Sequence, residues 1–289
     1  QPVAKLLCIT RRWIQLPFFL KKTYSYGTGE FFNLTSPAAS SGNTHELSAQ
    51  KEQIFGTMLN FLTKKLGRRS FLLEFRNLNE PLFGYRYFRK NGYFPIRWLR
   101  VRNSIHHTAI DKWMSASRKR QISRGLKNGA TTAVARTREE VENFFHMLKK
   151  YYSSKIQHYL PDLNFFISLI EQDAPGEEFG KIFLVRDKEH VIGGSVCLFS
   201  NDTCYLIFSA GMRKSYPRLY PGVLAIWAAM TYARQKGFDH FEFIDAGLPF
   251  KKYGYRDFIL RFGGKQISTR RWFKTRIGWL NKLLIKIYV

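Results

Sequence analysis

The spacing of hydrophobic residues divides the second half of the chain into helical and extended segments. Residues 137–152 carry apolar side chains at the helical period, and residues 163–172 do so over a shorter stretch. The pattern then changes to extended runs, which predict strands at 181–186, 191–199 and 203–210. Because short polar turns join these three strands, we expect them to form an antiparallel meander.

An apolar helix and one more strand follow the meander. Residues 222–236 are strongly apolar and end at Gly237, which is typical of a helix stop. Residues 239–245 alternate phenylalanine with polar residues, which predicts a strand. The tail, residues 273–289, returns to the helical period, with one apolar face formed by Ile277, Leu280, Leu284 and Ile287.

The first half has a weaker pattern. Residues 23–50 are rich in Gly, Ser, Thr and Asn and are expected to form a long surface loop. A helix over 50–66, a strand over 70–75, a helix over 80–90 and an extended segment over 93–101 follow in that order.

Two helices in the middle of the chain have clear end signals. A basic helix is predicted over residues 111–127, followed by Asn128 and Gly129 as its stop. One face of this helix, crowded with positive charge, is expected to contain Met114, Arg118, Ile122 and Leu126. The next helix begins at Thr137 with Glu140 three residues later, the spacing of a capping box. The second half therefore predicts an α+β lobe.

The composition points to a packed protein that attracts polyanions. Hydrophobic residues make up 45% of the chain, which is enough for packed cores and excludes a disordered basic tail. The 47 Lys and Arg against 21 Asp and Glu give a net charge of +26. A charge of this size attracts nucleic acid, anionic membranes and phosphorylated substrates. A basic enzyme without a polyanionic partner is the plainer alternative.

The cysteines and the longest apolar runs favour a reduced, cytoplasmic protein. Cys197 and Cys204 flank a predicted tight turn, but counting outward from that turn pairs Cys204 with Phe199, so no disulfide is expected. No Cys and His cluster has zinc-ligand spacing, and no metal site is predicted. No apolar run reaches 18 residues, and charges interrupt residues 1–22, so neither a membrane span nor a signal peptide is predicted.

Four segments, taken in order, resemble the GNAT acyltransferase fold and, more narrowly, its Fem-type branch. They are the basic helix and its exit at 117–129, Val191-Ile192-Gly193-Gly194-Ser195-Val196, Tyr220-Pro221-Gly222 with the later Phe243-Ile244-Asp245-Ala246-Gly247, and Phe262-Gly263-Gly264. The likeness covers residues 105–275. Family members place a Phe-Lys pair shortly before the final Phe-Gly, where this chain has Phe258 and Ile259.

The resemblance implies an α+β fold with a mixed, largely antiparallel central sheet flanked by helices, in two tandem GNAT-like lobes. We therefore expect a partial N-terminal lobe over residues 1–110, an acyltransferase lobe over 111–273 and a basic amphipathic helix over 274–289.

The resemblance also implies where a donor binds. In a GNAT fold the donor lies against splayed central strands, with its pyrophosphate at a helix N-terminus, where backbone N–H groups and the helix dipole favour an anion. The predicted donor-binding residues are Ser209, Gly211, Arg213, Lys214, Arg218 and Gly222. The loop has two stiff Tyr-Pro pairs and no glycine-rich cradle, so it is either adapted to a donor other than coenzyme A or a plain basic loop capping a helix.

Catalytic candidates follow the last predicted strand. Asp245 ends a strand expected to be central, where a carboxylate needs a partner, and it is the predicted general base or acceptor-binding group. Tyr253 is predicted to protonate the leaving group, and the predicted acceptor-binding residues are Lys251, Tyr255 and Arg256. The alternative is that Asp245 bonds the turn after it and that this loop is ordinary surface. The strand alternation places Glu242 away from the core.

The resemblance implies an acyl- or aminoacyl-transferase that forms an amide on an amine, in a cell-wall precursor or lipid-like substrate, near the cytoplasmic membrane face. Its expected co-substrate is acyl-CoA or aminoacyl-tRNA, with no tightly bound cofactor. One alternative is an acyl-CoA-dependent N-acyltransferase acting on a soluble small amine. Another is a basic nucleic-acid-binding protein without enzymatic activity.

The tail adds a predicted partner. Trp279 and Tyr288 stand among Lys and Arg on an apolar helix, a pattern typical of helices that lie in a membrane interface. An anionic membrane surface bound through residues 274–289 and a tRNA are therefore the expected partners, with the protein peripheral on the inner face of the membrane. A terminal helix packed on the body of the protein is the alternative.

Overall fold

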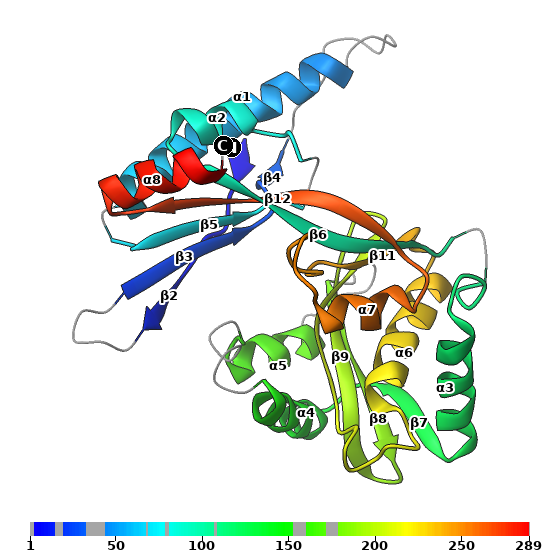
Figure 1. Ribbon diagram of the computed structural model, residues 1–289. Helices are drawn as coiled ribbons and strands as arrows, with labels where there is room; N and C mark the ends of the chain where they lie inside the picture. Colours follow the sequence, from blue (N-terminus) through cyan, green and yellow to red (C-terminus); the bar gives the residue numbers. More distant parts are fainter. Residues whose placement is uncertain are drawn as a thin grey trace. The chain divides into compact units, whose positions relative to one another are not determined.

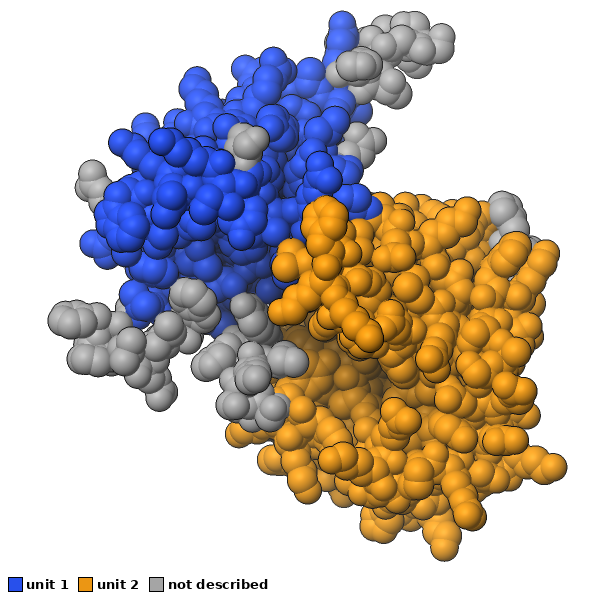
Figure 2. Space-filling view, viewed as in Figure 1, with its two compact units in different colours: residues 1–98, 268–289 blue, residues 99–267 orange. Residues whose placement is uncertain are grey.

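The computed structural model describes residues 3–14, 20–32, 44–67, 69–78, 81–106, 109–152, 160–171 and 179–288 (Figure 1). The chain divides into two compact units, coloured separately in Figure 2. Unit 1 contains Gln1–Trp98 and Ser268–Val289, and unit 2 contains Leu99–Ile267. In sequence, unit 2 is therefore inserted between two parts of unit 1.

Unit 1 contains most of the first half of the chain and its C-terminal end. Its elements are β1 (Ala4–Lys5), β2 (Ile9–Ile14), β3 (Leu20–Tyr26), β4 (Glu30–Phe31), α1 (Thr44–Gly67), β5 (Leu72–Arg76), α2 (Tyr85–Lys90), α8 (Gly278–Tyr288), and parts of β6 (Phe94–Ser104) and β12 (Lys265–Thr275). Strand β3 runs parallel to β5, with α1 as the crossover between them, and β5 pairs antiparallel with β12.

The two faces of the unit 1 sheet differ in chemistry. Leu73 and Phe75 point to an aromatic core under α1 and α2, where Phe88 stacks on Trp272 with ring centroids 4.6 Å apart. Glu74 points to the opposite face, where its Oε2 forms an ion pair with Lys22 Nζ at 2.5 Å. Burial alone raises the pKa of Glu74, but the nearby Arg76, Lys22 and Arg271 together hold it below its usual value.

Unit 2 contains the predicted meander and its helices. Its elements are α3 (Ala116–Lys127), β7 (Ala130–Val134), α4 (Arg138–Tyr151), α5 (Leu163–Glu171), β8 (Gly180–Asp187), β9 (His190–Ser200), β10 (Thr203–Gly211), α6 (Pro221–Gln235), β11 (His240–Phe243) and α7 (Gly254–Leu260), with the remainder of β6 and β12. Helices α3 and α6 cover one face of its sheet, and α4 and α5 cover the other (Figure 1). This is a three-layer arrangement.

The strands hydrogen-bond in the order β2-β3-β5-β12-β6-β11-β10-β9-β8-β7. Among the strand pairs described, β3 with β5 and β10 with β11 are parallel, and the others are antiparallel. The predicted α+β class, with a mixed and largely antiparallel sheet flanked by helices, is confirmed. The two units agree with the prediction of two lobes.

The strongest local signals are confirmed. Helix α4 begins after Thr137, whose side chain accepts from the backbone N–H of Glu140, while Glu140 accepts from the backbone N–H of Thr137. The meander has the predicted register, with Cys204 opposite Phe199 and no disulfide between Cys197 and Cys204. Each signal acts over a few residues, so the rest of the fold does not disturb it.

The predicted loop over residues 23–50 is wrong in the parts that the structure describes. Strand β3 covers its beginning, and α1 starts at Thr44. The inward-facing residues of β3 are Thr23 and Ser25, which are almost fully buried although polar. The Thr23 hydroxyl is 2.6 Å from that of Ser70, so hydrogen bonding replaces the apolar contact that a hydropathy pattern detects. Residues 33–43 lie outside the described residues.

The C-terminal end also differs from its prediction. Residues up to Thr275 belong to β12, which pairs with β5 and joins this end of the chain to unit 1. The compact units consequently differ from the predicted division at residues 110 and 273. Helix α8 buries Asn281 and half-buries Leu280 and Leu284, so the predicted apolar face is split between core and solvent.

Candidate functional site

The parallel strands β10 and β11 separate part-way along unit 2. They pair from Thr203 with His240 to Leu206 with Phe243, after which β10 continues to Gly211 without β11 beside it. The chain after β11 turns to β6 instead, where the backbone N–H of Ala246 donates to Leu99 O at 2.8 Å. In unit 1 the parallel pair β3 and β5 stays bonded to its end. The opening between parallel strands therefore belongs to unit 2.

Several predicted site residues meet at this opening. Tyr255 forms a hydrogen bond with the Ser209 side chain, and Asp245 and Tyr253 are close enough to raise its pKa. The rings of Tyr253 and Tyr255 have centroids 6.0 Å apart. Three segments of unit 2 thus bring Ser209, Asp245, Tyr253 and Tyr255 together.

One member of this cluster, Tyr152, has no functional signal in the sequence. Tyr152, at the C-terminal end of α4, donates its hydroxyl to Ser209 O at 3.1 Å and accepts from Ser209 N at 3.3 Å. Its place in the apolar repeat of α4 predicts only a core residue. No signal in the local sequence distinguishes a tyrosine that packs from one whose hydroxyl reaches another strand.

The environment keeps these hydroxyl groups protonated. Burial raises the pKa of Tyr255, and the adjacent Tyr152 raises it further. Burial also raises the pKa of Tyr152. The hydrogen bond with Ser209 lowers this pKa, whereas Tyr253 and Asp245 raise it. Protonated phenols can donate hydrogen bonds or a proton to developing negative charge.

Asp245 also bonds the turn that follows it. The backbone N–H of Gly247 donates to Asp245 Oδ1 at 3.2 Å. Gly247 has a positive φ of 75°, and an added Cβ there would lie 2.8 Å from the Tyr253 ring. The turn therefore holds the Asp245 carboxylate in place and lets Tyr253 pack close beside it.

The other predicted acceptor residues have different surroundings. Arg256 donates to the backbone oxygens of Leu248 and Lys251, both at 2.7 Å, and to Ala246 O at 3.4 Å. These bonds hold the Arg256 guanidinium against the loop that contains it. Lys251 is exposed. Ile259, which stands where the resemblance expects a lysine, is fully buried in the core.

The predicted donor loop presents its charges to solvent. Arg213, Lys214 and Arg218 are all exposed. Helix α3 packs against this loop. Asn128 Nδ2, at the end of α3, donates to Arg218 O at 3.0 Å. Gly125 of α3 lies so close to the loop that an added Cβ would be 2.7 Å from Leu219 O. The exposed cations of α3 and of this loop define one basic surface, made of Lys119, Arg120, Arg124, Lys127, Arg213, Lys214 and Arg218.

Gly211 and Gly222 serve a contact between strand and helix. An added Cβ on Gly211 would lie 2.3 Å from Gly222 N and 2.7 Å from its Cα. The end of β10 and the start of α6 can approach this closely only because Gly211 has no side chain.

Gly211→Ala is expected to destabilise unit 2 by about 1–3 kcal/mol, because the start of α6 must move away from β10. Gly222→Ala is the matched control, since an added Cβ there has no atom within 4 Å and alanine favours the helix. Thermal unfolding of both variants measures the difference. Equal melting temperatures would contradict the close contact.

Two predicted orientations are wrong. Arg118 is buried, with its guanidinium 4.4 Å and 4.3 Å from the ring centroids of Phe258 and Phe262, so it does not share the basic face of α3. Burial lowers the pKa of Arg118 to about 10. Glu242 was expected to point away from the core and is fully buried, bonded to Arg100 and Arg102. It does lie on the sheet face opposite Phe241 and Phe243, but that face is also covered.

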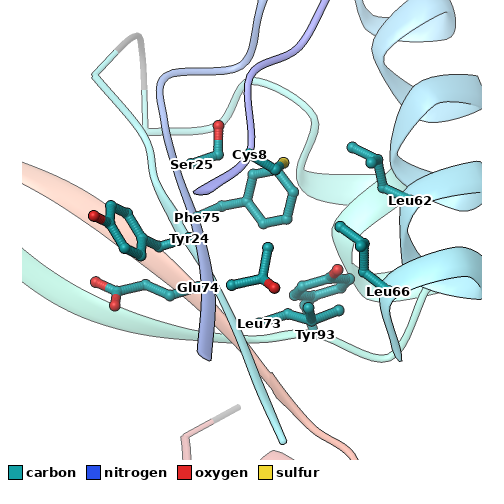
Figure 3. Close-up of a pocket in the computed structure, with 10 residues that line it drawn as sticks. Cys8, Tyr24, Ser25, Leu62, Leu66, Leu73, Glu74, Phe75 and Tyr93 are labelled. Atoms are coloured by element: carbon teal, nitrogen blue, oxygen red, sulfur yellow. The ribbon is translucent and has the colours of Figure 1, made fainter. Parts of the chain in front are cut away.

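Unit 1 has a small cavity between its sheet and α1. Figure 3 shows Leu62 and Leu66 of α1 facing Phe75 and Tyr93 across it. Its volume of about 10 Å³ is at the lower limit for one water molecule. This cavity is too small to hold a substrate. A second, open hollow of about 310 Å³ in unit 1 is lined by residues of α1, β5 and the end of β12, among them Lys64, Lys274 and Arg276. The candidate site is placed in unit 2 because the predicted residues meet there.

The elements around that opening match a known domain family. A family model described as an acetyltransferase (GNAT) domain matches residues 116–252, from the start of α3 to the loop before α7. Residues 116–252 are therefore similar to a GNAT domain. No curated protein sequence matches the chain closely enough to identify a relative.

Solved structures extend this likeness, in fold, to both units. FemX superposes with a TM-score of 0.59 at 13% identity, covering 98% of this chain and 86% of that one. The C-terminal domain of a putative lysylphosphatidylglycerol synthetase from Agrobacterium fabrum gives 0.58 at 11%, covering 99% and 88%. L-PGS from Bacillus licheniformis gives 0.60 at 10%, covering 92% and 82%. In fold, the predicted resemblance to the GNAT superfamily and its Fem-type branch is confirmed.

Proposed function

We propose that this protein transfers an acyl or aminoacyl group to an amine and so forms an amide. The observation that carries the proposal is the meeting of Asp245, Tyr253 and Tyr255 with Ser209, where β10 and β11 separate in a GNAT domain. A carboxylate and several phenols at an opening between strands supply a base and proton donors for such a transfer.

The reaction requires each residue in one role. Asp245 accepts a proton from the acceptor ammonium, so that the free amine attacks the acyl carbon and forms the C–N bond. The bond between the acyl carbon and the leaving oxygen or sulfur then breaks, and Tyr253 donates a proton to the leaving atom. The attacking nitrogen loses its second proton to solvent, which leaves a neutral amide. Tyr255 helps to stabilise the negative charge that develops on the carbonyl oxygen. Exchange with solvent returns both groups to their starting states.

The basic surface supports a donor that carries phosphates. It contains seven exposed cations, and residues 116–129 and 212–220 include no Asp or Glu. Cations without acidic partners bind phosphate chains strongly at low salt, as expected for either aminoacyl-tRNA or acyl-CoA. The amine of a cell-wall precursor or of a lipid-like molecule is the proposed acceptor, with a soluble small amine as the alternative.

Donor assays test this function directly. The purified chain is incubated with acetyl-CoA, long-chain acyl-CoA or charged tRNA and a set of amine acceptors, and products are identified by mass. The affinity for tRNA is measured as a function of salt concentration for the wild type and for the double variant Arg124→Glu with Arg218→Glu on the basic surface. The control is the double variant Lys149→Glu with Lys150→Glu on α4. Binding of RNA through the basic surface without turnover on any donor would favour the nucleic-acid-binding alternative.

We also propose that α8 contacts an anionic membrane surface. Trp279, Leu283 and Ile287 form a stripe along α8 and are 70%, 47% and 62% exposed, with Lys282 and Lys286 beside them. Exposed aromatic and aliphatic residues next to lysines are typical of helices in a membrane interface. Each lysine near an anionic leaflet contributes about 1 kcal/mol. In the described part of the chain, no helix is long and apolar enough to span a bilayer.

Trp279→Glu with Ile287→Glu is expected to weaken binding to phosphatidylglycerol vesicles at least tenfold, because it removes apolar contact and adds negative charge. Substitution is preferable to deletion of α8, since Asn281 of that helix is buried and bonds Gly92 O and Thr275 N. Vesicle sedimentation measures the change. The control is Phe61→Glu with Leu82→Glu, two equally exposed residues of unit 1. Equal loss in both variants would contradict a specific role for α8.

A further inference from the structure

The open edge of β10 has a hydrogen-bonding capacity that matters for donor choice. Strand β9 pairs with β10 as far as Gly211, but β11 pairs with it only as far as Leu206. Beyond Leu206, none of the strands that the structure describes lies on the side of β10 away from β9. Unpaired strand edges bind extended segments that contain amides, because the backbone N–H and C=O groups pair with those of the incoming segment.

Tyr152 fills this edge at Ser209. In a strand the N–H and C=O of one residue point to the same side, and both groups of Ser209 bond the Tyr152 hydroxyl, at 3.3 Å and 3.1 Å. The ring of Tyr152 packs edge-on against Phe208, with centroids 6.0 Å apart. A phenol in this position satisfies two buried backbone groups that would otherwise need a partner.

We propose that Tyr152 is a specificity residue of the donor site, which caps the β10 edge and disfavours donors whose acyl group is carried on an amide-containing arm. This inference rests on the proposed function and refines its donor. The arm of coenzyme A contains two amides and is suited to pair with a strand edge, so it must displace the Tyr152 hydroxyl. An acyl group esterified to a ribose has no such arm and reaches Asp245 and Tyr253 without displacing it.

The surroundings of Tyr152 agree with a role in the site. Asp245 and Tyr253 are close enough to affect its ionisation, and Tyr255 reaches the side chain of the same Ser209. A donor at the opening consequently meets Tyr152 beside the reacting groups. Tyr151, the preceding residue of α4, is 41% exposed and provides a matched control.

Titration calorimetry with coenzyme A and acetyl-CoA tests the proposal on the wild type, Tyr152→Phe, Tyr152→Ala and Tyr151→Phe. Loss of the hydroxyl frees both Ser209 groups, so Tyr152→Phe and Tyr152→Ala are expected to bind at least roughly tenfold more tightly than the wild type, a change of about 1.4 kcal/mol. Tyr151→Phe is expected to match the wild type. The Ser209 amide resonance is expected to shift on addition of coenzyme A in the Tyr152 variants alone.

Two outcomes would overturn the proposal: Tyr152 variants that fold and bind coenzyme A no better than the wild type, or a wild type whose Ser209 amide already responds to coenzyme A. Tyr152→Phe keeps the ring and its packing, so it still tests the proposal if Tyr152→Ala does not fold. The readout is binding and does not require turnover. A protein inactive with every donor would therefore refute the proposed function and still leave this series decisive for Tyr152.

Discussion

Asp245→Asn is expected to lower kcat by about 10²–10⁴-fold, the usual contribution of a general base. An amide cannot accept the proton of the attacking ammonium, and the amine stays non-nucleophilic. The side-chain oxygen of Asn can still accept from Gly247 N, as Asp245 Oδ1 does at 3.2 Å. The free energy of unfolding should consequently change by less than about 0.5 kcal/mol. Steady-state transfer with the donor found active, together with thermal unfolding, measures both quantities.

Asp257→Asn is the matched control for this prediction. Asp257 lies on α7, close to Asp245 in sequence, and is exposed. It is expected to retain wild-type turnover. If Asp245→Asn also turns over at the wild-type rate, Asp245 is not the base, and its role is limited to the turn at Gly247.

Glu242→Gln is expected to destabilise unit 2 by about 3–5 kcal/mol, because it removes the carboxylate from a buried charge cluster. Glu242 is fully buried, and Arg100 Nη1 donates to Glu242 Oε2 at 3.2 Å while Arg102 Nε donates to Oε1. Desolvation lowers the pKa of Arg100, and Glu242 is the charge that opposes this effect. The neutral amide leaves the buried Arg100 guanidinium without its carboxylate and beside the partly exposed Arg102.

Glu142→Gln is the control for this second prediction. Glu142 pairs with Arg138 one helical turn away on the surface of α4, with side chains 38% and 67% exposed. Such pairs contribute about 0.3–0.5 kcal/mol. Denaturant unfolding of the two variants compares the same chemical change in two environments. A loss below about 1 kcal/mol for Glu242→Gln would mean that water reaches the cluster.

Much of unit 2 could be predicted from its sequence, because its signals are local and agree with one another. The capping box at Thr137 and the turn between β9 and β10 involve neighbouring residues. Because these interactions are short in range, neighbouring residues are enough to predict them. Strands β3 and β12 were missed for the opposite reason. The inner face of β3 is held by hydroxyl contacts from distant residues, and β12 is defined by its pairing with β5.

The candidate site divides in the same way. Ser209, Asp245, Tyr253 and Tyr255 were predicted from strand ends and from the resemblance, and the structure brings them together. Arg256 was predicted to bind the acceptor, and in the structure its guanidinium donates to three backbone carbonyls. A residue type indicates what chemistry is available, whereas its hydrogen-bond partners decide whether that chemistry faces a substrate.

The alternation of apolar and polar residues, read in order, was sufficient by itself to predict an α+β chain with an antiparallel meander, because side-chain period follows directly from backbone geometry. Only the tertiary structure decided that Glu242 is buried and that Tyr152 reaches Ser209. Both depend on what covers the second face of a sheet and on where two strands separate. Those features arise from contacts between residues far apart in the chain, and no local pattern contains them.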